Sequence, residues 1–161
     1  MEDRYLYKAK RADNGEWVQG YLFDDGFENG RVFIGGLVIE KYTGTACDDW
    51  TISGSCFCEV DKSTICQCTG LKDKNGKLIW ENDILDGFTY PYMSDGVHNY
   101  YVEVCWCTNV PSFCIYTQKY PEAKVAGISA GNTELMEGWN PDDWEVIGNI
   151  FDNPELLESE E

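Results

Sequence analysis

Residues 66–85 have the sequence CQCTGLKDKNGKLIWENDIL, and this stretch decides the fold. Two short apolar runs, CQCTGL and KLIW, flank a polar centre that contains the pair Asn75-Gly76. Asn-Gly is the strongest two-residue signal for a type I′ turn, because that turn needs a positive φ at both central positions. The stretch therefore predicts a β-hairpin closed by a type I′ turn.

The same pattern extends outward along the chain. Residues 4–23 alternate around the sequence ADNGEW, and residues 24–44 place a second NG pair before an apolar run. Both segments predict hairpins, and further strands are expected over 101–117 and 144–151. Residues 44–56 are rich in Gly, Ser, Thr and Asp and predict a loop or irregular crossover.

Long runs with a period of 3.6 residues are scarce, so the chain predicts a mainly β protein, either all-β or a β-rich α+β fold. A short helix is expected at 132–137, and a helical or frayed acidic end after residue 152. The 161 residues suit one compact domain or two small, closely packed ones.

The charge is strongly acidic, with 29 Asp and Glu against 12 Lys and Arg. Affinity for nucleic acid comes mainly from basic side chains that displace counterions, so direct DNA or RNA binding is disfavoured, as is docking on an anionic membrane. No segment approaches the roughly 20 apolar residues of a membrane-spanning helix. The first residues lack the apolar core of a signal peptide, so we expect a cytoplasmic protein whose 8 cysteines are mostly reduced.

Two stretches resemble the YopX-like family of phage and prophage proteins. They are VDKSTICQCTGLKDKNGKLIWENDIL and WEVIGNIFDNPELL, and the opening LYKAKRADNGEWVQGYL is also similar to the start of the family. Cys68 stands where the family usually has Tyr, and Asn82 stands where it usually has Gly. We expect both changes to be tolerated, because Cys is a small buried hydrophobe and Asn adopts the left-handed conformation readily.

The resemblance implies a β-rich fold with a small SH3-like barrel element and a phage or prophage origin, but no activity. We accordingly expect an N-terminal hairpin region at 1–60 and a β-barrel region with an acidic C-terminal segment at 61–161, packed as one compact unit. The bacterial host's cytoplasm is the expected location.

The cysteines offer three interpretations. Three pairs have C-x-C spacing, which puts both sulfurs of a pair on one face of a strand; the pairs begin at Cys56, Cys66 and Cys105. Packing thiols, a zinc site and a disulfide within a pair all remain open, although structural zinc sites favour C-x2-C knuckles and none is present. No cofactor is predicted.

Catalytic patterns are weak. His98 is the only histidine and lies in an expected loop, with no Ser-His-Asp order or nucleophile elbow near it. Asp73, Asn75 and Glu81 resemble a calcium loop only faintly, because Lys77 occupies a ligand position. We therefore predict a protein that is not an enzyme; an enzyme that uses a Cys thiolate or a bound zinc ion is the third and weakest hypothesis.

The last 37 residues contain 10 acidic residues and no Lys or Arg. They are either a solvated surface or a surface that mimics nucleic-acid charge and binds a basic groove on another protein. The predicted partner-binding residues are the acidic side chains outside the family-like strands: Glu134, Glu137, Asp142, Asp143, Glu158, Glu160 and Glu161.

Our leading hypothesis is therefore an accessory protein that binds a host protein with a basic surface, for instance a defence complex that handles nucleic acid. The alternative is an oligomer that sequesters a signalling nucleotide in an aromatic pocket. That pocket would consist of Tyr90, Tyr92, Tyr100 and Trp106. The scarcity of basic residues argues against it, because phosphates bind cations. A homo-oligomer is compatible with either hypothesis.

Overall fold

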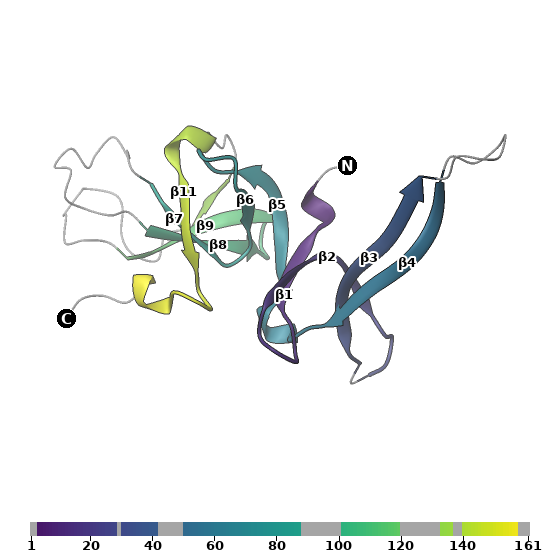
Figure 1. Ribbon diagram of the computed structural model, residues 1–161. Coiled ribbons are helices and arrows are strands. Elements are labelled where there is room, and N and C mark those ends of the chain that lie inside the picture. The colour runs from purple at the N-terminus through teal and green to yellow at the C-terminus, as the bar shows by residue number, and fades with distance from the viewer. Residues whose placement is uncertain are drawn as a thin grey trace, which may run out of the picture. The chain divides into compact units, whose positions relative to one another are not determined.

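The computed structural model describes residues 3–28, 30–41, 50–87, 101–119, 133–136 and 140–157. The internal contacts divide the chain into two compact units. Figure 1 labels the strands of both units. The N-terminal unit is Arg4–Gln67, and the C-terminal unit is Met1–Asp3 together with Cys68–Glu161. The predicted division at residue 60, and the packing as one compact unit, stay predictions.

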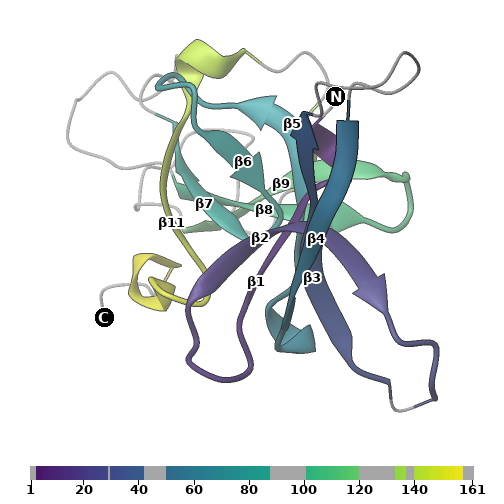
Figure 2. The same cartoon turned by 45° about the vertical axis from the view of Figure 1, so that its right-hand side comes forward.

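The N-terminal unit is a meander of antiparallel strands (Figure 2). In chain order these are β1 (Tyr7–Lys10), β2 (Trp17–Asp24), β3 (Val32–Lys41), β4 (Trp50–Glu59) and the start of β5 (Cys66–Lys72), with the short 3-10 helices η1 (Asp3–Tyr5) and η2 (Lys62–Thr64). β1 pairs with β2, β2 with β3 and β3 with β4, and the other edge of β1 pairs with β5. The core consists of the buried side chains Ala9, Val32, Ile34 and Val60.

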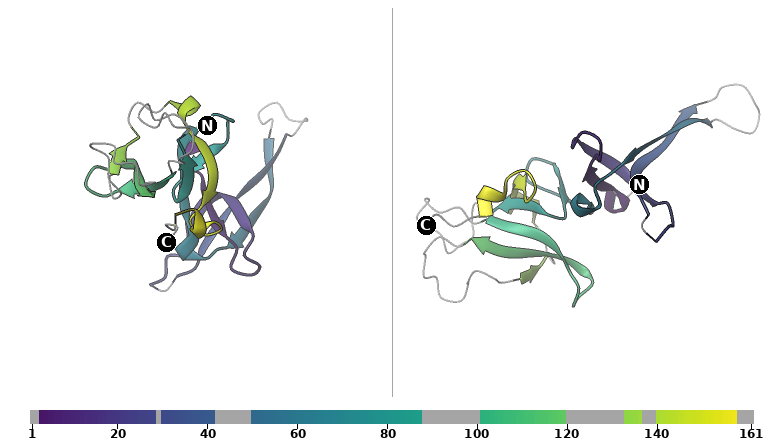
Figure 3. Two further views of the ribbon diagram at one scale, coloured as in Figure 1. Left: turned by 90° about the vertical axis from the view of Figure 1, so that its left-hand side faces the viewer. Right: turned by 90° about the horizontal axis from the view of Figure 1, so that it is seen from below.

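The C-terminal unit contains a second antiparallel sheet (Figure 3). Its strand order is β10-β9-β8-β7-β11. Its elements are β6 (Leu78–Trp80), β7 (Asp83–Asp86), β8 (Tyr101–Cys107), β9 (Ser112–Lys119), β10 (Thr133–Leu135), η3 (Pro141–Asp143), β11 (Glu145–Asn149) and η4 (Pro154–Leu157). The remainder of β5 pairs with β6. The core consists of Ile79, Leu85, Val102, Val104, Ile115, Trp144 and Val146.

The predicted mainly β fold is confirmed, and its sheets are antiparallel. Across the described strands the sheets stay open, so the implied SH3-like element does not appear there as a closed barrel. Within the same part of the chain, no helix is long and apolar enough to cross a membrane.

The turn at Asn75-Gly76 closes a hairpin, but its predicted type was wrong. Gly76 has a φ of 78°, whereas Asn75 is not among the residues with positive φ. The backbone bonds from Gly76 N to Asp73 O and from Asp73 N to Lys77 O close a three-residue loop instead. The Asp73 carboxylate holds this loop, because its Oδ1 accepts hydrogen bonds from the N–H groups of Asn75 and Lys77, each at 2.9 Å.

Two further local predictions were wrong. Residues 50–56, expected in a loop, belong to β4, because their backbone completes the ladder with β3 from Gly36 to Lys41. The helix expected at 132–137 is instead the strand β10 at Thr133–Leu135, whose backbone pairs with β9. In both places pairing with another strand decided the structure against local composition.

Both departures from the family pattern fit as expected. Cys68 is fully buried, and Asn82 is the one non-glycine residue with a positive φ, 66°, among those described. In the closing family-like stretch, position 148 requires glycine, because a Cβ on Gly148 would lie 2.5 Å from Asn153 Oδ1. The family-like residues therefore serve turns and close packing.

Candidate binding surfaces

The acidic charge is concentrated in the C-terminal unit. The N-terminal unit has seven Lys and Arg against ten Asp and Glu, a net charge of −3. The C-terminal unit has five against 19, a net charge of −14. A basic partner would therefore be attracted to the C-terminal unit far more strongly than to the N-terminal one.

The structure places two of the predicted partner-binding side chains. Asp142 and Asp143 lie on η3 and are exposed. Asn140 holds this turn, because its Nδ2 donates to Asp143 Oδ2 at 3.0 Å. Glu134 lies on β10, where its backbone pairs with Ile115. The other predicted acids lie outside the described residues: Glu137, Glu158, Glu160 and Glu161.

The segment from η3 into β11 is fastened to the family-like hairpin. Lys74 N donates to Trp144 O at 3.1 Å, and Lys74 Nζ forms an ion pair with Glu145 Oε2 at 2.7 Å. Val146 N donates to Asp73 Oδ2 at 3.0 Å, and the Trp144 side chain is buried in the core. The exposed carboxylates of η3 therefore project from a rigid support, which favours selective binding because little order is lost on association.

Negative charge also accumulates between β7 and β11. Asp86 and Glu145 are directly opposite each other in the antiparallel ladder, and Asp86 is only 7% exposed. Burial raises the pKa of Asp86, the Glu145 carboxylate raises it further, and Lys74 lowers it. Like charges directly opposite each other destabilise a sheet, so this pair weakens the fold while adding to the acidic character of the unit.

Replacement of Asp86 by Asn is expected to stabilise the protein at neutral pH by about 0.5 kcal/mol, the size of a cross-strand charge effect. Because the folded-state pKa is raised, the folded state binds the proton more tightly, and wild-type stability recovers as the pH falls through that pKa. The advantage of Asp86→Asn should therefore shrink between about pH 7 and about pH 4. Urea unfolding at both pH values measures it, and an advantage unchanged with pH would contradict the assignment.

Three of the four residues of the predicted aromatic pocket, Tyr90, Tyr92 and Tyr100, are outside the described residues, and so is His98. Trp106 is described and is 44% exposed. Its ring packs edge to face against Phe113, with centroids 5.0 Å apart and an interplanar angle of 81°. The contact fixes the Trp106 ring on one face of the β8–β9 hairpin.

A second surface, which the sequence reasoning missed, lies on the N-terminal sheet. Tyr21 and Phe23 are two residues apart on β2, and Phe57 lies across β3 from them. All three are between 38% and 44% exposed, and the rings of Phe23 and Phe57 meet edge to face at 4.9 Å. The period of two in WVQGYLF could have predicted this aromatic face, which we define as Trp17, Tyr21, Phe23, Phe33 and Phe57.

Basic side chains border the aromatic face. Lys8 Nζ and Lys10 Nζ lie 5.2 and 5.5 Å from the centre of the Trp17 ring. The Arg31 guanidinium lies 5.5 Å from the centre of the Phe33 ring. Exposed aromatic rings held by cation–π and edge-to-face contacts are typical of surfaces that contact a partner.

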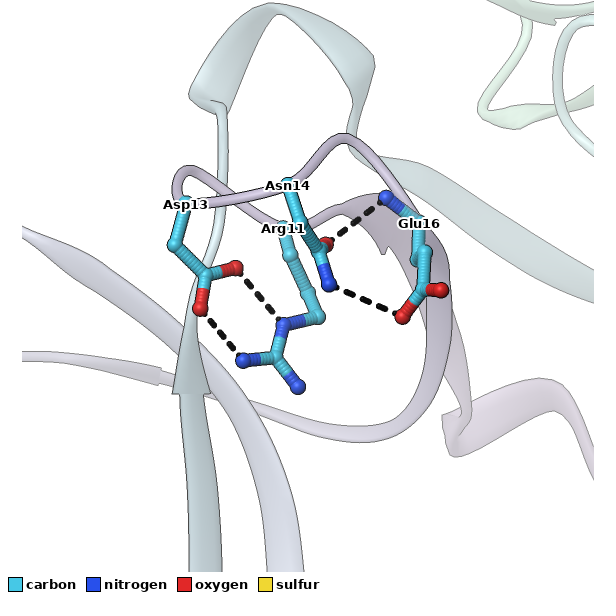
Figure 4. A network of polar contacts seen from close by, with 4 residues as sticks. All are labelled: Arg11, Asp13, Asn14 and Glu16. Atoms are coloured by element: carbon cyan, nitrogen blue, oxygen red, sulfur yellow. Dashed lines mark hydrogen bonds and ion pairs between the residues drawn. The ribbon is translucent and has the colours of Figure 1, made fainter.

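The first hairpin loop carries a local polar network (Figure 4). Arg11 donates two parallel hydrogen bonds to the Asp13 carboxylate, and Asn14 Nδ2 donates to Glu16 Oε2 at 2.9 Å. Arg11 and Asp13 also line an open hollow of about 430 Å³ with Phe57, Cys58 and Glu59. The bidentate pair neutralises Arg11, so the hollow offers an anion little net positive charge.

The thiols occupy varied environments. Cys66, Cys68 and Cys114 are buried, Cys58, Cys105 and Cys107 are half-buried, Cys56 is exposed, and Cys47 lies outside the described residues. All seven described cysteines are free thiols. Across that part of the chain, no three His, Cys, Asp or Glu side chains are grouped so as to hold a metal ion.

By its fold and its surfaces, the chain is an antiparallel β protein with two compact units, of which the C-terminal one is strongly acidic. The YopX protein family model matches residues 36–158. The chain therefore belongs to the YopX protein family, as the sequence resemblance predicted.

The chain is similar over nearly its whole length to a solved structure. That structure is the crystal structure of protein EF1440 from Enterococcus faecalis, which is similar with a TM-score of 0.52 and 25% sequence identity. The similarity covers 94% of this chain and 96% of that chain. No curated protein matches the sequence.

Proposed function

We propose that the protein is a non-enzymatic phage or prophage accessory protein that acts in the cytoplasm of a bacterial host by binding another protein. The observation that carries the proposal is the charge of −14 on the C-terminal unit, with exposed carboxylates on the firmly anchored η3–β11 segment. A partner with a basic surface is the chemistry that this arrangement favours.

Proteins that handle nucleic acid present such basic surfaces, because they bind phosphate through Lys and Arg. A surface that takes the place of nucleic acid would block such a protein, and a host defence complex is a target of this kind. The aromatic face supports the binding of a protein partner in general, since exposed aromatic rings, such as that of Tyr21, contribute much of the energy at protein interfaces. The strongly acidic composition disfavours direct binding of nucleic acid or an anionic membrane.

The test is a pull-down with tagged full-length protein from host lysate, washed at low and at high salt. A basic partner that is retained at low salt and released as salt rises is expected, because exposed charges are screened within about a nanometre at physiological salt. If no protein is retained, and heating the purified sample releases a nucleotide, the proposal is wrong and the nucleotide-sequestering oligomer replaces it.

Charge reversal then locates the surface. The double variant Asp142→Lys/Asp143→Lys is expected to weaken binding of the captured partner about tenfold or more, because each change replaces an attraction by a repulsion. Isothermal titration calorimetry measures the affinity. The matched control is Glu16→Lys/Glu28→Lys, which makes the same change of charge at exposed residues of the N-terminal unit. Equal weakening by both variants would show a general charge effect and contradict a site on η3.

A further inference from the structure

Three cysteines gather on one face of the β8–β9 hairpin. Cys105 and Cys107 are two residues apart on β8, so their side chains share a face of the sheet. Cys114 on β9 is directly opposite Cys105, and Cys107 is opposite Ser112. Cys107 and Cys114 are therefore diagonal neighbours on the same face, while Trp106 and Phe113 pair on the other.

Cys107 has the environment of a reactive thiol. It ends β8, immediately before the turn into β9, so the backbone N–H groups of Val110 and Asn109 in that turn and the Cys114 thiol lie near its sulfur. These donors favour the thiolate and lower the pKa of Cys107. Cys107 is also only half-buried, so a small reagent reaches the sulfur.

Cys114 is the complementary thiol. It is fully buried, and burial raises its pKa to about 11, helped by the neighbouring Cys107. It therefore stays protonated, its thiol donates to the backbone oxygen of Ser112 at 3.8 Å, and it is the diagonal neighbour of Cys107 on the same face of the hairpin. Cys105 differs, because burial raises its pKa and the Glu103 carboxylate adds to the effect.

We propose that Cys107 is a site of oxidation by hydroperoxides and that Cys114 resolves it as a disulfide. The Cys107 thiolate attacks the distal oxygen of ROOH; the O–O bond breaks, RO⁻ leaves and takes up a proton, and the sulfur becomes a sulfenic acid. The Cys114 sulfur then attacks the Cys107 sulfur, an S–S bond forms, and water leaves with the thiol proton. Overall two thiols are oxidised by two electrons, and ROOH is reduced to ROH and water.

The full-length protein allows a direct test, because chymotrypsin cleaves after Trp106 and after Phe113. Digestion therefore separates Cys105, Cys107 and Cys114 into different peptides. In a short pulse of iodoacetamide at about pH 7, Cys107 is expected to be labelled about tenfold faster than Cys105 or Cys114. After hydrogen peroxide and acid quenching with N-ethylmaleimide, mass spectrometry should find the Cys107–Cys114 disulfide as the main product within the hairpin.

Three variants define the roles. Cys107→Ser should abolish peroxide-driven oxidation of Cys114, and Cys114→Ser should leave a sulfenic acid on Cys107 that dimedone traps. Cys105→Ser is the matched control and should leave the disulfide unchanged. Because Cys105 is directly opposite Cys114, a Cys105–Cys114 disulfide is the competing product. Its predominance in the wild-type protein, or equal labelling of the three thiols, overturns the proposal, and neither readout depends on a variant's folding.

Discussion

Replacement of Asp73 by Ala is expected to lower the free energy of unfolding of the C-terminal unit by about 3–5 kcal/mol. The carboxylate is 3% exposed and accepts three backbone hydrogen bonds, from Asn75 and Lys77 at 2.9 Å and from Val146 at 3.0 Å. Without it, three N–H groups lose their partner: the Val146 N–H is buried, where an unsatisfied donor costs about 1–3 kcal/mol, and those of Asn75 and Lys77 are part-buried. The hairpin would also lose its bond to β11.

The pKa of Asp73 predicts how this stabilisation depends on pH. Burial alone would raise this pKa, but the hydrogen bonds from Val146, Lys77 and Asn75 outweigh burial and hold it below its usual value. A lowered folded-state pKa means that the carboxylate stabilises the fold fully above the unfolded-state pKa. That contribution is lost progressively as the pH falls below about 4. The pH dependence is opposite in sign to that of Asp86, whose ionised form weakens the fold and whose protonation at low pH restores stability.

Urea unfolding followed by circular dichroism measures the loss, and hydrogen exchange with mass spectrometry assigns it to one unit. The matched control is Asp61→Ala in the N-terminal unit. Asp61 accepts hydrogen bonds from Ser63 N at 2.9 Å and Ser63 Oγ at 2.7 Å, but it is exposed. Removing this cap should cost only about 1 kcal/mol. If the two variants lose equal stability, Asp73 does not act as the link between the hairpin and β11.

The sequence predicted those features of the fold that depend on neighbouring residues. Alternation of apolar and polar side chains gave the hairpins, and the Asn-Gly pairs marked two of the turns. Asn82 could be assigned a left-handed conformation because it stands where relatives have Gly, and its φ of 66° agrees. These properties depend on a few consecutive residues, so a single sequence contains them.

Contacts between distant residues explain the wrong predictions. The type of the 73–77 turn depends on Asp73, whose second carboxylate oxygen binds the N–H of a residue 73 positions away. The strand at Thr133–Leu135 exists because β9 offers it a pairing edge. Composition does not show that Val146 is the partner of Asp73 or that β9 is the partner of Thr133–Leu135. Strand formation depends on such distant partners more than helix formation does.

For the candidate surfaces too, the sequence predicts local features, whereas contacts between distant residues are seen only in the structure. An excess of carboxylates is visible in the sequence, but the anchoring of Asp142 and Asp143 through Lys74 and Trp144 is visible only in the structure. The placement of Cys107 and Cys114 as neighbours on one face depends on the register of the β8–β9 hairpin, because a shift of one residue would put the two thiols on opposite faces. The aromatic face has a sequence signal, but its exposure follows from the core lying on the other face.

Replacement of Gly35 by Ala is expected to destabilise the N-terminal unit by about 3 kcal/mol. Gly35 lies on β3 between Tyr21 on β2 and Phe57 on β4. A Cβ at this position would overlap the backbone oxygen of Cys56 and lie 2.6 Å from the Phe57 ring. Backbone cannot give way as a flexible side chain does, so the β3–β4 ladder would have to shift and Phe57 would be displaced from the aromatic face.

Gly36 provides a control at the adjacent position. A Cβ there would have its nearest neighbour, Tyr21 Cδ2, at 3.9 Å, an ordinary van der Waals contact. Gly36→Ala should therefore change stability by no more than about 0.5 kcal/mol, with a small gain expected because Ala restricts the unfolded chain. Urea unfolding and hydrogen exchange of β3 and β4 distinguish the two variants. Equal stabilities would show that Phe57 and the Cys56 carbonyl do not pack on Gly35, and the aromatic face would then lack the support described for it.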